Sequence, residues 1–355
     1  MFSFKNIYKC YLECRKNKAT KINTLEFEAN LLENLWKLYD ELNSKTYRIG
    51  KSICFLTHSP KLREVFAATF RDRIVHHILV KELKPFYEPK FISDVYNNRK
   101  NKGIHNGAKK AQSYMQRYKD GYYLQLDIKG FFYNLDKNIL FKALFDAISK
   151  SDLKEKENIL WLVNKIIYHK PQLNFTFKGD ISKLHSLPPH KTLFKIAPSK
   201  GLAIGNLTSQ FFANVYMNSF DNFVKRELKV KSYIRYVDDF VLFDTSKEKL
   251  EMLKIKIENY LKSNLALELR DDAKLRSFSD GLDFLGYIIR PNYILARQRV
   301  VNNFKYKKAK FYEYYENGGD KVREPIIRYN QTVASFNAHI KHANSYNLKR
   351  KVGVV

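Results

Sequence analysis

The chain has 355 residues, of which 45% are hydrophobic, and 64 Lys and Arg against 36 acidic residues give a formal net charge of +28. This length suggests two or three packed subdomains. The charge predicts a polyanionic partner, with nucleic acid as the default, and a merely soluble basic protein is the alternative. No stretch approaches the roughly 18–20 apolar residues of a membrane-spanning helix, so we expect no membrane partner. Three cysteines and no secretion signal predict free thiols and a cytoplasmic protein.

Hydrophobic spacing and turn residues predict the elements of the first half in chain order. They are helices across residues 1–44, a strand at 47–57, a helix at 71–83 ended by Pro85, a polar loop at 93–110, a helix near 108–118, a buried strand at 121–128 and a helix at 137–147.

The second half is predicted to contain an ordered loop or hairpin excursion rich in proline, followed by alternating helices and strands. These elements are the excursion at 171–203, a helix at 208–228, a hairpin around Asp238–Asp239, a helix opened by a capping box at 245–248, a strand at 282–289 and basic helices over 297–351 broken at Gly318–Gly319 and Pro325. Split-βαβ domains are built in this order, which brings the strand of Asp127 beside the Asp238–Asp239 turn.

The most informative segment is Tyr236–Asp239, with two adjacent carboxylates at the turn of the predicted hairpin. Adjacent acids repel each other, and a divalent cation is the usual group that holds them together. A plain turn is the structural alternative, since Asp is a common turn residue. Asp127 at the end of its strand likewise has an alternative role as a cap. Together, the three acids favour two-metal phosphoryl transfer.

Four sequence blocks occur in the order found in reverse transcriptases. They are Asp127–Phe132, Gly201–Gln210, Tyr236–Asp239 and Phe284–Tyr287. The chain resembles this family over roughly residues 45–290. The resemblance implies an α+β fold of the right-hand fingers–palm–thumb type, with a split-βαβ (RRM-like) palm and a helical thumb. The implied divisions are an N-terminal helical extension at 1–44, fingers at 45–120, a palm at 121–290 and a thumb at 291–355.

One departure refines the resemblance. Most of the family has Gln-Gly-x-x-x-Ser-Pro in the second block, whereas this chain has Ile204-Gly205 and Ser209-Gln210. That variant, with the stretch 187–191 upstream, resembles the reverse transcriptases of diversity-generating retroelements. These bacterial or phage-encoded enzymes copy a template-repeat RNA with errors opposite adenine. The implied partners are structured template RNA, the RNA/cDNA duplex, dNTPs and a small basic accessory variability protein.

The resemblance assigns the chemistry to a few residues. Asp127, Asp238 and Asp239, together with Ile128, would hold two Mg²⁺ ions, with Mn²⁺ as a substitute. Lys274 lies near the position of a lysine that protonates the leaving pyrophosphate. A surface lysine is the alternative at that position.

Nucleotide selection is assigned to residues of the first two blocks and the fingers. Phe132 matches the steric gate against ribose, with a core Phe as the alternative, which is the role expected of Phe131. Arg63, and more weakly Lys61, would hold the triphosphate, because guanidinium binds phosphate in a bidentate way; a solvated basic loop is the alternative. Ile204 replaces an amide that contacts the incoming nucleotide, and Gly205 would allow close approach to the templating pair.

Template and primer contacts are expected from basic and motif residues, although runs of charge are often only solvated faces. The residues are Arg99, Lys100, Lys102, Gln210, Tyr236, Leu285, Gly286, Lys307 and Lys308. Two other functions stay open. One is a retron-like or phage-defence reverse transcriptase, and the other is a catalytically idle RNA-binding scaffold, against which the three acids argue.

Overall fold

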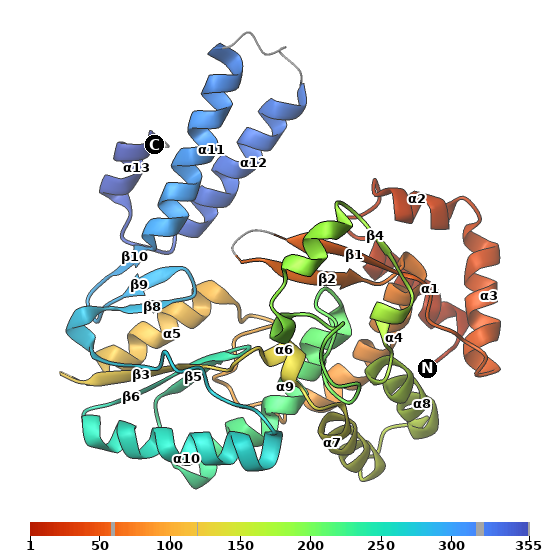
Figure 1. Cartoon of the computed structure of the whole chain (residues 1–355), viewed down its shortest axis with the longest axis horizontal. Coiled ribbons are helices and arrows are strands. Elements are labelled where there is room, and N and C mark those ends of the chain that lie inside the picture. The colour runs from red at the N-terminus through yellow and green to blue at the C-terminus, as the bar shows by residue number, and fades with distance from the viewer. Residues whose placement is uncertain (58–60, 119, 317–322, 354–355) are drawn as a thin grey trace. The chain divides into compact units, whose positions relative to one another are not determined.

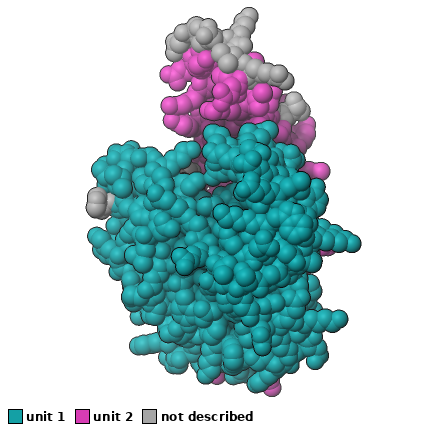
Figure 2. All heavy atoms as spheres, turned by 90° about the vertical axis from the view of Figure 1, so that its right-hand side faces the viewer, with its two compact units in different colours: residues 1–92, 128–228, 257–270 teal, residues 93–127, 229–256, 271–355 magenta. Residues whose placement is uncertain are grey.

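The computed structural model describes residues 1–57, 61–118, 120–316 and 323–353, and the chain forms two compact units (Figure 2). Unit 1 comprises Met1–Ile92, Ile128–Leu228 and Ile257–Arg270, whereas unit 2 comprises Ser93–Asp127, Lys229–Lys256 and Asp271–Val355. None of the described helices is both long enough and apolar enough to cross a membrane. The four divisions expected from the sequence remain a prediction.

Unit 1 is mainly helical (Figure 1). Its elements are α1 (Phe4–Arg15), α2 (Ile22–Glu28), α3 (Leu31–Asn43), β1 (Ser52–Thr57), β2 (Arg63–Ala67), α4 (Phe70–Tyr87), α6 (Phe131–Asn134), α7 (Lys137–Ser149), α8 (Lys156–Ile167), β4 (Phe175–Phe177) and α9 (Leu207–Asn222). The apolar side chains of α4 are buried because α1 and α9 both pack against it. Helix α10 (Lys247–Leu265) runs from unit 2 into unit 1.

The proline-rich excursion at 171–203 is an integral part of unit 1, as its residues predicted. Its strand β4 pairs in parallel with β1, which gives a sheet of order β2-β1-β4. The carboxylate of Glu64 on β2 is buried and accepts hydrogen bonds from the hydroxyl of Thr192 at 2.6 Å and the backbone N–H of Leu193 at 2.9 Å. These contacts fasten the excursion to the β1–β2 hairpin.

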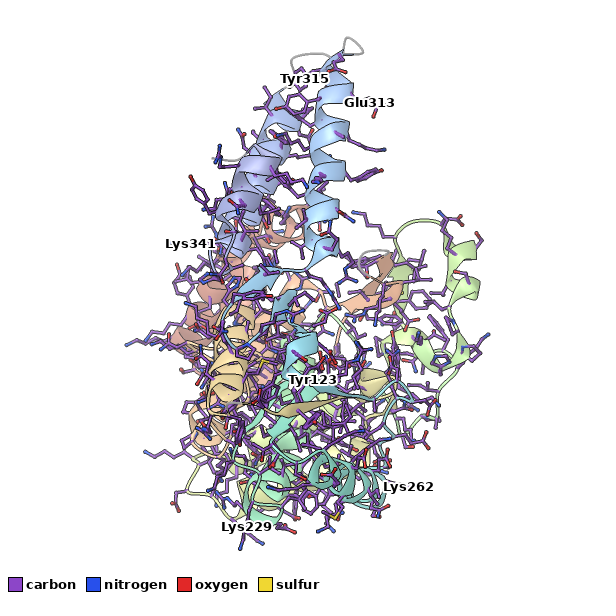
Figure 3. The ribbon with its side chains drawn as sticks, turned by 90° about the vertical axis from the view of Figure 1, so that its left-hand side faces the viewer. Tyr123, Lys229, Lys262, Glu313, Tyr315 and Lys341 are labelled. Atoms are coloured by element: carbon purple, nitrogen blue, oxygen red, sulfur yellow. The ribbon has the colours of Figure 1, made fainter. Side chains whose placement is uncertain are left out.

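Unit 2 contains a split-βαβ sheet, as predicted, but its last strand is β7 (Lys274–Ser277) and not the strand predicted at 282–289, which lies in a separate sheet. The strands of the split-βαβ sheet are β3 (Tyr122–Asp127), β5 (Tyr233–Tyr236), β6 (Asp239–Asp244) and β7. Their spatial order is β5-β6-β3-β7, and every neighbouring pair is antiparallel. Tyr123, labelled in Figure 3, lies in the core of this unit with Ile234 and Phe243. Tyr123, Leu124 and Leu126 of β3 are buried, whereas Gln125 and Asp127 are only partly buried, so the second half of the strand follows its two-residue period.

The rest of unit 2, as far as the structure describes it, carries a small three-stranded sheet and four α-helices. These elements are α5 (Ile104–Gln116), β8 (Leu282–Phe284), β9 (Tyr287–Ile289), β10 (Ile294–Ala296), α11 (Gln298–Glu316), α12 (Arg323–Ile340) and α13 (Tyr346–Val352). Helices α11 and α12 pack through Phe304 and Phe336, whose rings stack with centroids 4.0 Å apart. Glu313 and Tyr315 lie towards the end of α11, and Lys341 directly follows α12 (Figure 3).

The helix end predicted before Pro85 and the helix break predicted at Pro325 were both wrong, because each proline lies inside a helix. Helix α4 continues through Pro85 to Tyr87, whose buried ring lies 5.9 Å from that of Phe91. Packing of Tyr87 therefore outweighs the missing N–H. Pro325 lies in the first turn of α12, where backbone N–H groups have no helical acceptor. Gly318–Gly319 lie outside the described residues.

Two further predictions need correction. Residues 282–289 form a hairpin, β8 and β9, instead of one strand, since Leu285 and Gly286 turn the chain with φ of 55° and 88°. The helix α10 is capped by Ser246 and not by Thr245, because the Ser246 hydroxyl accepts from the backbone N–H of Lys249 at 3.1 Å.

Candidate active site

Three acids lie at one end of the split-βαβ sheet. Asp127 is the last residue of β3 and pairs directly with Asp239, the first residue of β6. Tyr236 pairs with Asp239 across the hairpin, so Val237 and Asp238 form its two-residue turn. The predicted convergence of the three acids on one sheet edge is therefore present within unit 2, and Asp239 opens the strand instead of sharing the apex.

The turn that carries Asp238 has a strained backbone held by buried partners. Val237 has φ of 60°, a conformation that β-branched residues rarely adopt. The guanidinium of Arg235, which is fully buried, donates to the Val237 carbonyl at 2.8 Å. The Val237 N–H donates to the side-chain oxygen of buried Asn97 at 3.0 Å. These hydrogen bonds therefore fix the backbone of the turn from which the Asp238 side chain extends.

Electrostatics within this group disfavour full ionisation. Burial, and then the charges of Asp127 and Asp238, raise the pKa of Asp239 to about 7, whereas a hydrogen bond from Gln125 and the charge of Lys274 act in the opposite direction. The Asp239 carboxyl therefore keeps its proton to a higher pH than an ordinary aspartate does. A cation placed among these acids would remove the repulsion and favour the ionised form.

The donor set suits a hard divalent cation. Mg²⁺ prefers carboxylate oxygens and completes its octahedron with water and substrate phosphate. In the described part of the chain, no three His, Cys, Asp or Glu side chains already have the geometry of a metal site. The opposed pair Asp127 and Asp239, with Asp238 on the adjoining turn, fits an ion that also takes oxygens from substrate and solvent.

Two side chains adjoin the acids from the same sheet. The Gln125 amide donates to Asp239 Oδ1 at 3.1 Å and to the Asp283 carbonyl at 3.2 Å. Lys274, predicted from the resemblance, pairs with Gln125 across β3 and β7 and lowers the pKa of Asp239. Sequence reasoning missed Gln125. The signal was its position two residues before Asp127, which places both on one face of β3.

The predicted nucleotide-selecting residues are linked to each other within unit 1. Phe131 is buried, as expected for a core residue, and Phe132 beside it is partly exposed. The carbonyl of Phe132 accepts from the N–H of Leu202 at 2.8 Å, and the carbonyl of Ile204 accepts from the N–H of Phe66 at 3.0 Å. The segment 202–204 therefore runs between α6 and β2. The Ile204 side chain packs against the apolar cluster around Phe66.

Gly205 packs tightly against the protein. It has φ of 114°, and an added Cβ would lie 2.7 Å from Cγ1 of Val65 on β2. Arg63 and Lys61 are exposed on the β1–β2 hairpin, and Gln210 is exposed in the first turn of α9.

The nucleotide-selecting residues belong to unit 1, whereas the three acids belong to unit 2. Ile128, the first residue of unit 1 in the segment that follows Asp127, is buried. A common site for both sets of residues remains a prediction.

The basic loop before α5 is partly used by the protein itself. The Lys102 ammonium donates to the Ser93 carbonyl at 2.6 Å and lies 4.7 Å from the centre of the Tyr96 ring. Arg99 donates to the Val95 carbonyl at 3.4 Å. Lys100 is exposed and is the most accessible of the three predicted template-binding residues.

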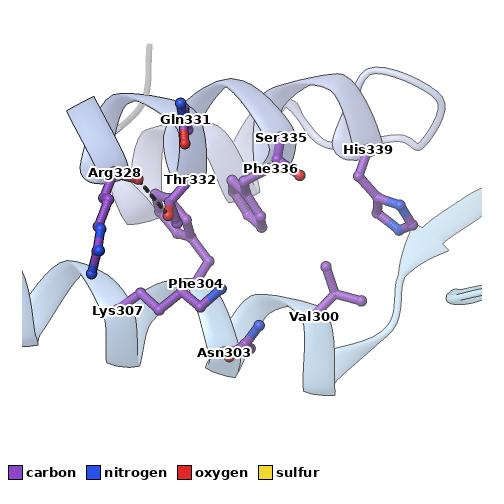
Figure 4. A pocket seen from close by; sticks show the side chains of 10 residues that line it. All are labelled: Val300, Asn303, Phe304, Lys307, Arg328, Gln331, Thr332, Ser335, Phe336 and His339. Carbon is purple, nitrogen blue, oxygen red and sulfur yellow. Dashed lines mark hydrogen bonds between the residues drawn. The ribbon is translucent and has the colours of Figure 1, made fainter. Parts of the chain in front are cut away.

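A groove of about 440 Å³ runs between α11 and α12 (Figure 4). Lys307 from α11 and Arg328 from α12 line it, together with Asn303 and Gln331. Lys308, predicted beside Lys307, instead donates to the Val352 carbonyl at 2.7 Å, and thus helps to attach α13. The polar and basic lining of the groove is of the kind that contacts nucleic-acid backbones.

Comparisons with known proteins identify the family. A family model described as reverse transcriptase (RNA-dependent DNA polymerase) matches residues 57–289. Protein YkfC of Escherichia coli K12 is 24% identical over 328 residues, covering 81% of this chain and 80% of YkfC. The group II intron-encoded protein LtrA of Lactococcus lactis is 22% identical over 324 residues, covering 73% of this chain and 50% of LtrA. The chain thus spans about half the length of LtrA.

Among solved structures, apo telomerase from Candida tropicalis is similar with a TM-score of 0.49 and 11% identity, covering 70% of this chain and 55% of telomerase. The family model carries the assignment, because it spans more than half of the chain and includes all four sequence blocks with Asp127, Asp238 and Asp239. This chain therefore belongs to the reverse transcriptase family and is an RNA-directed DNA polymerase.

Proposed function

We propose that this enzyme extends a primer on a structured RNA by two-metal nucleotidyl transfer at Asp127, Asp238 and Asp239. The observation that carries the proposal is the direct pairing of Asp127 with Asp239, beside the locked turn of Asp238. When bound there, Mg²⁺ would activate the 3′-hydroxyl and neutralise the triphosphate. In the reaction the 3′-oxygen bonds to the α-phosphorus, the bond to pyrophosphate breaks, and the hydroxyl proton is released.

The chain's own groups have distinct tasks around this step. Gln125 holds the Asp239 carboxylate through a hydrogen bond from its amide. Lys274, on the neighbouring strand, supplies positive charge near Asp239 and would give a proton to the leaving pyrophosphate, the role that the resemblance implies. Lys307 and Arg328 of the α11–α12 groove would bind the backbone of the product duplex.

Primer extension on a defined RNA, with dNTPs and Mg²⁺, tests the catalytic part. Wild type should incorporate nucleotides, and Asp238→Ala should not. Asp280→Asn serves as the matched control, since Asp280 is an exposed acid of unit 2 outside the sheet edge. Extension by Asp238→Ala, or tight RNA binding without extension by wild type on any RNA, would overturn the proposal and favour the idle scaffold.

We further infer that synthesis is error-prone opposite template adenine, as in diversity-generating retroelements. The support is the Ile204-Gly205 and Ser209-Gln210 variant, together with the apolar surroundings of Ile204. Because Ile204 packs beside Phe66 and has no amide to offer a nucleotide, selection of the nascent pair would lose a polar contact.

Sequencing of the cDNA tests this second part. Ile204→Gln should lower misincorporation opposite adenine, whereas Ile204→Leu, which keeps an apolar side chain of the same size, should not. Equal error frequencies in all three enzymes would contradict the role of Ile204. Accurate copying by wild type, with and without a small basic accessory protein, would instead favour a retron-like or phage-defence enzyme.

A further inference from the structure

The turn between β8 and β9 is held in an unfavourable conformation. Phe284 pairs with Tyr287, so Leu285 and Gly286 are the two turn residues, and both have positive φ. This geometry suits the twist of a hairpin but disfavours leucine at its first position. Such strain persists only where the surroundings determine the backbone.

Two helices hold this turn in place. On the α5 side, an added Cβ at Gly107 would lie 2.6 Å from Cδ1 of Leu285. On the α12 side, Nε2 of His339 lies 3.3 Å from the Gly286 carbonyl, and an added Cβ at Gly286 would lie 3.0 Å from the His339 ring. The turn is therefore in close contact with both helices and has little room to move while they stay in place.

Four rings continue this contact, and we call His105, Tyr287, His339 and His342 the Tyr–His stack. The Tyr287 ring lies parallel to that of His339, with centroids 4.3 Å apart. The ring of His105, from α5, stacks on that of His342 at 4.1 Å. Residues separated by more than 230 positions in the sequence thus join α5, β9 and the end of α12.

Hydrogen bonds fix the orientation of the stack. The Tyr287 hydroxyl donates to the His339 carbonyl at 2.9 Å and lies 2.6 Å from Nδ1 of His105. Since the hydroxyl has one proton, Nδ1 of His105 is the donor in the second bond. The facing rings do not form a metal site, because no cluster in the described residues has metal-site geometry.

We propose that the Tyr–His stack positions the Leu285–Gly286 turn against the end of α12 and so sets where the primer terminus is held during synthesis. The inference rests on the proposed function and on the primer contact that the sequence resemblance assigns to Leu285 and Gly286. Its residues are positioning residues, since they act on the primer through the turn. The contacts of Gly286 with His339 and of Leu285 with α5 carry the inference.

The surroundings of the stack favour uncharged histidines. Burial, followed by the charges of His342, His339 and Lys109, lowers the pKa of His105. Burial, followed by Lys109 and Lys341, lowers that of His342. For His339, burial and His342 lower the pKa, against a raising contribution from the Gly286 carbonyl. Tyr287 stays neutral, because burial raises its pKa to about 12.

Every charged group on these elements that influences the histidines is positive, so protonation would introduce repulsion among His105, His342, Lys109 and Lys341. The contact should be intact above the ordinary histidine pKa and weaken as the pH falls below it.

Hydrogen exchange tests the positioning role without any need for activity. Tyr287→Phe keeps the ring and removes the hydroxyl, so exchange of the amides at 284–289 and 337–342 should rise about five-fold, the effect of one lost hydrogen bond. Tyr346→Phe, at an exposed tyrosine of α13, is the matched control and should not change it. Unchanged exchange in both Tyr287→Phe and His339→Ala would overturn the proposal.

Synthesis supplies the functional readout. With a trap that prevents rebinding, Tyr287→Phe should add several-fold fewer nucleotides per binding event than wild type. His339→Phe, which retains a ring against Tyr287, should recover part of the loss seen in His339→Ala. Equal run lengths in wild type and Tyr287→Phe would contradict the proposal.

The pH dependence of run length provides a further test, because a merely structural role of the stack would not make run length depend on histidine protonation. Run length in wild type should fall between about pH 8 and about pH 5.5, on either side of the ordinary histidine pKa. The double variant His105→Phe/His342→Phe keeps stacked rings that do not titrate, so its profile of run length against pH should be flatter than that of wild type. An equally steep profile would overturn the proposal.

Failure of wild type to extend any primer would instead refute the proposed function. The hydrogen-exchange measurement would still decide whether the stack positions the turn.

Discussion

Asp127 and Asp239 stand directly opposite each other on neighbouring antiparallel strands, at the end of the sheet where the Val237–Asp238 turn begins. Opposed like charges destabilise a strand pair. The pair is therefore a structural cost in the metal-free protein, and its arrangement makes sense as a site whose function needs both charges.

Neutralising one member of the Asp127–Asp239 pair should lower the activity without lowering the stability of the protein. Asp239→Asn removes repulsion with Asp127 and should leave the melting temperature unchanged or raised, while primer extension falls on the order of 10³-fold, since metal-bound charge stabilisation is worth several kcal/mol. Calorimetry and single-nucleotide addition measure the two effects. A lower melting temperature with retained extension would contradict this interpretation; Asp280→Asn is the control.

Removing the amide of Gln125 should change the requirement for Mg²⁺. Its hydrogen bond lowers the pKa of Asp239, so Gln125→Leu should raise that pKa above about 7 and leave more of the carboxyl protonated at neutral pH. We expect the Mg²⁺ concentration for half-maximal extension to rise several-fold and to recover at higher pH. Gln298→Leu, on the exposed start of α11, should have no such effect.

Relieving the backbone strain at Val237 should preserve the stability of the protein but slow nucleotide addition. Val237→Gly removes the unfavourable left-handed valine, and the gain of about 1–2 kcal/mol is partly offset by the greater freedom of unfolded glycine. Stability in urea should therefore be equal or slightly higher, while the rate of nucleotide addition falls because Asp238 is held less firmly. Val237→Thr, which keeps the branched side chain, should behave like wild type in both measurements.

Buried His76 should make the protein less stable in mild acid. Burial lowers its pKa to about 4 in the folded protein, against an ordinary value of 6.5. Between these values the unfolded chain binds a proton that the folded chain does not, so stability falls by about 3 kcal/mol as the pH drops from 6.5 to 4. Denaturant midpoints across this window should show a shallower slope for His76→Leu; parallel slopes would refute the assignment.

Salt dependence should report the role of the α11–α12 groove. If Lys307 and Arg328 each contact a phosphate, the double alanine variant should bind an RNA/DNA hybrid more weakly and with a salt slope smaller by about 2. Lys351→Ala, at an exposed lysine of α13, is the matched control. A slope unchanged from wild type would exclude the groove as a backbone contact.

The local patterns of the sequence were sufficient for much of the fold. The apolar alternation of residues 121–128 predicted β3, and the order of elements predicted its placement beside the Asp238–Asp239 hairpin, because split-βαβ topology brings these strands together. Gln125 could have been found by the same two-residue period.

Long-range packing accounts for most of what was missed. His339 and His342 share a helical face in the sequence, but nothing in their spacing indicates His105 as the third ring, which approaches from α5. Pro85 reads as a helix end, yet the burial of Tyr87 extends α4 beyond it. Such outcomes depend on tertiary contacts that local propensity does not encode.

The hydrogen bonds that join the side chains of Arg235 and Asn97 to the Val237 backbone should also affect how fast metal ions bind and leave. Because the hairpin is assembled by protein contacts, ions would enter a scaffold that needs little rearrangement, and they could leave again after each round without unfolding it. Chelation should then stop synthesis at once while leaving the circular dichroism spectrum intact, and restored Mg²⁺ should revive the enzyme without a refolding delay.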